Sequence, residues 1–161
     1  MLRLSKKADY ALIAMRHLAA GEPGSSSSAR EIAESYAIPA ELLAKVLQRL
    51  VRARLLVSVQ GTRGGYKLGR PAHQMTVADV IQAIDGPVAV TACSPTNHTC
   101  EQFERCEIRD PLWKIKSRIV DALATVSLAE LAEPAEAVPV VAVPVALTMA
   151  TPGRPSARLA D

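Results

Sequence analysis

The sequence predicts a mainly α-helical protein in which a pair of helices is followed at once by a short β-hairpin. Residues 39–54 predict a helix, because their apolar side chains recur at helical spacing as Leu43, Val46, Leu47 and Leu50. Residues 55–59 and 66–68 are β-leaning runs on either side of a glycine-rich turn, which is typical of a hairpin. Two helices joined by a tight turn, with a hairpin after them, form a winged helix-turn-helix with a two-stranded wing.

The elements before this stripe are predicted from periodicity and caps. Residues 8–20 form a first helix with Leu12 and Met15 on its buried side. Ser28 precedes Glu31 by three residues, which is the spacing of a capping box, and opens a short second helix. The turn that follows leads into the helix with the apolar stripe.

Further helices are expected after the hairpin. Thr76 caps a helix that ends at Gly86. Asp110 is placed to cap the longest helix, with Pro111 in its first turn, and Ser127 caps one more short turn. The long helix has a near-heptad apolar stripe, which favours pairing with a second copy of the chain: Leu112, Ile115, Ile119, Leu123 and Val126.

The length of 161 residues suits one domain, and its core must be aliphatic because aromatic residues make up only 3% of the chain. After residue 132 prolines interrupt any regular pattern. The predicted division is a winged helix-turn-helix region over 1–72, a connecting helix over 73–92, a cysteine loop over 93–109, a dimerisation helix over 110–132 and a flexible Pro/Ala/Val-rich tail over 133–161.

Charge is distributed unevenly along the chain. Residues 1–72 hold twelve Lys/Arg against five Asp/Glu, whereas residues 73–161 hold seven against eleven, so the balance changes from +7 to −4. A basic half fits a polyanionic partner. No export signal and no apolar run of membrane length are visible, so we expect a cytoplasmic protein with no membrane partner.

Double-stranded DNA is the expected polyanion. Lys45, Gln48 and Arg49 repeat at helical spacing roughly opposite the apolar stripe, where they can reach major-groove base edges and phosphates. Arg63, at the hairpin tip, is expected at a minor groove. A dimer would then read a two-fold symmetric operator. The residues expected at the DNA are Ser28, Arg30, Lys45, Gln48, Arg49, Arg52, Gln60, Thr62, Arg63 and Tyr66.

The three cysteines of the chain fall within fourteen residues, as Cys93, Cys100 and Cys106. In a reducing cytosol an odd, clustered set favours metal ligation over disulfides. Thiolates suit an iron–sulfur cluster or zinc, although structural zinc usually uses cysteine pairs two to four residues apart, which this spacing lacks. The residues alone leave three readings open: an iron–sulfur cluster, zinc and unligated thiols.

Catalysis and a small-molecule substrate are not expected. The three histidines, His17, His73 and His98, stand in unrelated segments. None of them is paired in sequence with a nucleophile that it could activate as a base.

Several motifs together carry a family resemblance over about residues 2–131. They are Leu4-Ser5-Lys6, Asp9-Tyr10-Ala11-Leu12, Ile32-Ala33, the 50–56 segment, Gly61-Thr-Arg-Gly-Gly-Tyr66-Lys-Leu68 and the three late cysteines. They resemble the Rrf-type family of winged-helix iron–sulfur transcriptional regulators (IscR/NsrR-like).

The resemblance implies a homodimeric repressor with an iron–sulfur cluster, 2Fe-2S or 4Fe-4S, held in each subunit by three cysteines and one other ligand. Residues 8–12, residues 86–93 and the arginine after the last cysteine resemble regulators of iron–sulfur assembly operons, which makes assembly genes the expected target. A nitric-oxide or redox sensor of the same family stays an alternative, as does a metal-free or zinc-binding repressor.

The fourth ligand departs from the biogenesis repressors of this family. They use a histidine three residues after the last cysteine, where this chain has Arg109, which cannot ligate. Ala44-Lys45 also replaces their Glu-Gln pair, so the operator should differ. In nitric-oxide-sensing relatives an aspartate near the start of the first helix completes the cluster of the partner subunit. Asp9 matches that position, and the other candidates are His98, Glu101, Glu104 and Glu107.

Overall fold

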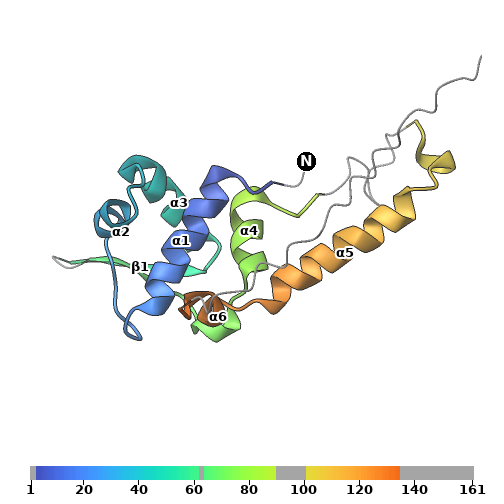
Figure 1. Cartoon of the computed structure of the whole chain (residues 1–161). Helices are drawn as coiled ribbons and strands as arrows, with labels where there is room; N and C mark the ends of the chain where they lie inside the picture. Colours follow the sequence, from blue (N-terminus) through green and yellow to red (C-terminus); the bar gives the residue numbers. More distant parts are fainter. Residues whose placement is uncertain (1–2, 62–63, 90–100, 135–161) are drawn as a thin grey trace, which may run out of the picture.

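A computed structural model describes residues 3–61, 64–89 and 101–134 of the chain. Helices form a body from which one long helix projects (Figure 1). Within the described residues the elements are, in order, α1 (Lys6–Ala20), α2 (Ala29–Ser35), α3 (Ala40–Arg52), β1 (Leu56–Val59), β2 (Gly65–Leu68), η1 (Ala72–Gln74), α4 (Val77–Asp85), η2 (Phe103–Arg105), α5 (Arg109–Thr125) and α6 (Leu128–Ala132). The predicted winged helix-turn-helix is confirmed.

Helix α1 lies at the centre of the body, between α3 and α4, and also contacts α6 and β2 (Figure 1). Its buried face consists mostly of alanine, with Met15 and Leu18 as the larger side chains. Met15 is buried as predicted, whereas Leu12 is half-buried at the edge of the core. The helix begins two residues before the predicted start, because Ser5 caps it by accepting a hydrogen bond from the Ala8 amide.

The helix-turn-helix consists of α2 and α3. Ser28 caps α2 through the predicted capping box. The apolar stripe of α3 is fully buried, as expected, with each of its four side chains at most 1% exposed. Ala37 in the turn has a φ of 51°, a left-handed conformation that reverses the chain between the two helices.

The wing is an antiparallel pair in which Leu56 lies opposite Leu68 and Val59 opposite Gly65. It is tied to the start of α2, because the Ser27 and Tyr66 amides donate to each other's carbonyls at 3.1 and 2.9 Å. A side chain at Gly65 would place its Cβ 2.5 Å from the Ser27 oxygen. This close approach explains why glycine begins β2.

Of the three later N-terminal caps that were predicted, those at Thr76 and Ser127 are confirmed. Thr76 forms a capping box with Asp79 at the start of α4, and Gly86 ends that helix with a φ of 83°. Asp110, however, does not cap α5, so that prediction was wrong. The helix begins at Arg109 with Ile108 at the cap position, two residues before the start that a cap at Asp110 would give. The Asp110 carboxylate instead accepts a hydrogen bond from Arg109 at 2.8 Å.

Residues 110–132 form two helices with different surroundings. Helix α5 carries no buried residue, and its start projects away from the body (Figure 1). Helix α6 is capped by Ser127 as predicted and packs against α1. Leu128 is fully buried, and Arg16 of α1 donates to the Leu131 carbonyl at 3.1 Å. Most of the predicted tail, 135–161, lies outside the described residues.

No helix in the described part of the chain is both long enough and apolar enough to span a lipid bilayer.

Candidate functional site

One exposed face of α3 carries all the residues of this helix that were predicted to contact DNA. We call this surface the reading face; its members are Lys45, Gln48, Arg49 and Arg52, and all four side chains are exposed. The buried stripe fixes the orientation of α3, because rotating the helix about its axis would bring these polar residues into the core. The reading face is therefore held rigidly and presents three cations to solvent.

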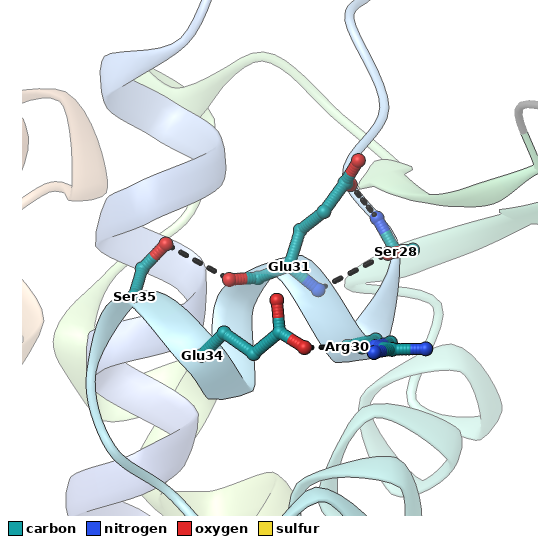
Figure 2. A network of polar contacts seen from close by, with 5 residues as sticks. All are labelled: Ser28, Arg30, Glu31, Glu34 and Ser35. Carbon is teal, nitrogen blue, oxygen red and sulfur yellow. Dashed lines mark hydrogen bonds and ion pairs between the residues drawn. The ribbon is translucent and has the colours of Figure 1, made fainter.

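The start of α2 forms a polar network beside α3 (Figure 2). The Ser28 amide donates to the Glu31 carboxylate at 2.7 Å, and the Ser28 hydroxyl accepts from the Glu31 amide at 3.1 Å. These hydrogen bonds hold the pKa of Glu31 below its ordinary value of 4.5, and the bond from the Ser28 backbone contributes most. The Ser28 hydroxyl, predicted to meet DNA, thus also serves as a helix cap.

Arg30 is the cation of this network and is more exposed than its partner Glu34. Its guanidinium contacts the Glu34 carboxylate at 2.8 Å, one helical turn further on, while 84% of the arginine side chain stays exposed (Figure 2). The hydrogen bond to Glu34, followed by its charge, raises the pKa of Arg30. A surface pair of this kind is weak, so a phosphate could replace Glu34 as the partner of Arg30.

The wing brings two more predicted residues to the side of α2. Gln60 is exposed directly after β1, and Tyr66 is half-buried in β2. Their place relative to α2 is fixed by the Ser27–Tyr66 backbone pair. No sequence pattern indicated this pair, because it joins residues far apart in the chain. Thr62 and Arg63, expected at the wing tip, lie outside the described residues.

The described end of the cysteine loop contains one of the three predicted cysteine ligands. Cys106 follows η2, is half-buried and carries a free thiol, while Cys93 and Cys100 lie outside the described residues. Residues 3–61, 64–89 and 101–134 contain no group of three or more Cys, His, Asp or Glu side chains suited to a metal. A site would thus need ligands from outside these ranges or from a second subunit.

Arg109, which the sequence excluded as the fourth ligand, makes other contacts with its guanidinium. One of its nitrogens donates to the Phe103 carbonyl at 3.1 Å, and another donates to Asp110. Asp110, through this hydrogen bond, raises the pKa of Arg109, and Arg109 in turn lowers the pKa of Asp110. The chemistry of a guanidinium therefore fits a supporting role beside Cys106 rather than ligation.

Asp9 and Cys106 are not brought together within one chain. Asp9 is half-buried in the first turn of α1, whereas Cys106 lies three residues before the first residue of α5, and the start of α5 lies far from α1 (Figure 1). Glu101, Glu104 and Glu107 are exposed on either side of Cys106, and His98 lies outside the described residues. An Asp9 ligand would have to come from a second subunit.

The capping box gives a pH-dependent prediction for stability. Because the folded-state pKa of Glu31 is depressed, its contribution to stability should be complete above 4.5 and should be lost as pH falls through the folded-state pKa. The melting temperature of the wild-type chain should therefore exceed that of Glu31→Gln at pH 7, and the difference should become smaller below pH 4.5. A difference that stayed constant down to acidic pH would contradict this role.

Comparisons with known proteins agree with the fold. Residues 4–134 match the Rrf2 family, described as an iron-dependent transcriptional regulator. The regulator IscR of Vibrio campbellii is 34% identical over 131 residues, which cover 81% of this chain and 77% of that protein. An HTH-type regulator of Mycobacterium tuberculosis is 40% identical over 88 residues, 55% of each chain, so the chain matches about half the length of this curated relative.

Solved structures of transcriptional regulators are similar to this chain in fold. CymR, the global cysteine regulator of B. subtilis, is similar with a TM-score of 0.69 and 27% identity, covering 84% of this chain and 100% of that one. IscR of T. potens has a TM-score of 0.64 and 26% identity, covering 84% and 93% of the two chains. These relatives are transcriptional regulators rather than enzymes. The chain belongs to the Rrf2 family of transcriptional regulators.

Proposed function

We propose that this chain is a DNA-binding repressor that senses iron–sulfur cluster status through its three cysteines. The observation that carries the DNA-binding part is the reading face on α3, a helix that contacts both α2 and strand β1 of the wing. Family membership supports regulation of transcription. The sensor part rests on the thiols and on the resemblance to regulators of iron–sulfur assembly genes.

In the proposed complex α3 lies in the major groove. Lys45, Gln48 and Arg49 reach base edges and nearby phosphates, and Arg52 contacts a phosphate farther along. The start of α2 binds the backbone through Ser28 and Arg30, because helix N-termini and arginines both attract phosphate. The wing adds contacts from Gln60, Thr62, Arg63 and Tyr66, with Arg63 at the minor groove.

We infer that two copies pair through α5, the proposed dimerisation helix. It has 17 residues, and none is buried in the single chain. Ile115, on its apolar stripe, is 46% exposed. Covering such a stripe is favourable, and a second copy presents the same stripe in return. The dimer would place two reading faces on a two-fold symmetric operator.

The donor set fits an iron–sulfur cluster. Cys93, Cys100 and Cys106 would supply three soft thiolate ligands, and the free, only half-buried thiol of Cys106 can join them. The separation of α1 from the start of α5 means that the fourth ligand, if it is Asp9, comes from the other copy. When bound, the cluster supplies a group that oxidants or nitric oxide can alter, which is the property a sensor requires.

A second candidate is a regulator whose cysteines respond directly to oxidants as thiols. The similarity to CymR of Staphylococcus aureus, whose structure has been solved in an oxidized form, favours it. Anaerobic purification separates the two functions. A brown protein with visible absorbance and bound iron supports the cluster, whereas a colourless, iron-free chain that nevertheless binds DNA in a thiol-dependent way supports the second candidate.

The reading face gives a prediction for DNA binding. Arg49→Ala should weaken binding to the DNA upstream of the chain's own gene by roughly 10- to 100-fold, because it removes a charged contact worth about 1–3 kcal/mol. Arg118→Ala, at an exposed position on α5, is the matched control and should bind within twofold of wild type. Gel-shift titrations at several salt concentrations measure both. Equal affinity of the two variants would rule out the reading face as the DNA contact.

The fourth ligand gives a second prediction. If Asp9 of the partner subunit ligates, Asp9→Ala should still load iron on the cysteines, but the cluster should be lost faster and its visible spectrum should differ. His98→Ala should leave both properties unchanged. Cluster decay is followed by visible absorbance after anaerobic reconstitution. The reverse pattern would place the ligand within the cysteine loop.

A further inference from the structure

Three side chains beside Cys106 form a cluster that the proposed function does not use. The chain has one phenylalanine and one tryptophan, and both contact the guanidinium of Arg109. The guanidinium carbon lies 4.7 Å from the centre of the Phe103 ring and 5.4 Å from that of Trp113. The two rings lie 6.4 Å apart and tilted, within the range of a direct aromatic contact.

The contacts of Arg109 join both ends of the segment that holds Cys106. Phe103 lies in η2, three residues before the cysteine, and Arg109 lies three residues after it as the first residue of α5. The hydrogen bond from Arg109 to the Phe103 carbonyl, at 3.1 Å, closes this segment into a short loop. Trp113, one turn further along α5, fixes the loop to the helix through the same guanidinium.

Arginine suits this task better than lysine. Its planar group can stack on two rings while its edge donates hydrogen bonds, here to Phe103 and Asp110. Only 25% of the arginine side chain is exposed, so the contacts are partly shielded from water. An ammonium could supply the charge but not the flat surface and the separate donors at once.

We propose that Arg109 is a positioning residue that holds Cys106 against the start of α5 before any metal binds. The loop would then offer Cys106 as a ligand already in place, since a fixed ligand loses less freedom on binding. The inference rests on the proposed cluster site, because that site gives the positioning of Cys106 its purpose. The contacts of Arg109 with Phe103 and Trp113, which we call the clamp, require no metal.

The clamp is tested on the metal-free full-length chain. Iodoacetamide alkylation of each cysteine is followed by peptide mass mapping in the wild type and in Arg109→Ala, Arg109→Lys and Arg118→Ala. Losing two hydrogen bonds, to Phe103 and Asp110, and two cation–π contacts should raise the rate at Cys106 about tenfold in Arg109→Ala. Arg109→Lys should react nearly as fast as Arg109→Ala, and Arg118→Ala should match the wild type.

Equal rates at Cys106 in wild type and Arg109→Ala would overturn the clamp, as would full recovery of slow labelling in Arg109→Lys. Trp113 gives an independent check, because it is the only tryptophan and its emission should become more open to acrylamide quenching in Arg109→Ala. Thermal melting of the variants is the control for folding, and each variant should melt cooperatively like the wild type.

The loaded chain separates this inference from the proposed function. After anaerobic iron and sulfide reconstitution, Arg109→Ala should show altered visible circular dichroism, because one ligand is less firmly oriented; an unchanged spectrum would count against the positioning role. A wild-type chain that takes up no iron would contradict the cluster proposal. The alkylation rates, measured without metal, would still decide whether Arg109 clamps the loop.

Discussion

The alanine-lined face of α1 is the constraint on which the other elements depend. Ala8, Ala11 and Ala14 are fully buried and have no bulk beyond Cβ, so neighbouring helices can approach closely. Helices α3, α4 and α6 all pack on α1, and β2 also contacts it. A larger side chain on this face would push at least one of these elements outward. The orientation of the reading face on α3 is therefore set by the packing on the opposite side of that helix.

The same packing connects the reading face to the cysteine segment. The end of α5 is tied to the start of α4, because the Val77 amide donates to the Val126 carbonyl at 3.0 Å. The Leu128 amide then donates to Met75 at 2.9 Å, so the chain after α5 returns to the core next to α1. A change at Cys106 has a covalent path through α5 to this junction. The path makes coupling between cysteines and DNA physically reasonable, although coupling still requires two states with different DNA affinity.

Local patterns in the sequence predicted most of the fold. The apolar stripe of α3, the capping box at Ser28 and the cap at Thr76 depend on residues within one or two turns of each other, and all three are confirmed. The prediction that Asp110 caps α5 was wrong, because the Asp110 carboxylate accepts a hydrogen bond from its neighbour Arg109. The return of α6 to α1 and the Ser27–Tyr66 pair were missed, because they join distant segments and leave no periodic signal. The aromatic contacts of Arg109 could have been suspected, since the only phenylalanine and the only tryptophan flank it.

The most direct measurement of the proposed switch compares one preparation in two states. The chain is purified anaerobically with its cluster and titrated against the DNA upstream of its own gene; a chelator then removes the iron and the titration is repeated. A sensor predicts affinities that differ about tenfold, in either direction, and that return to the first value on reconstitution. Cys106→Ala should match the iron-free state throughout. Equal affinities with and without the cluster would contradict the proposal that this regulator reads its cysteine site.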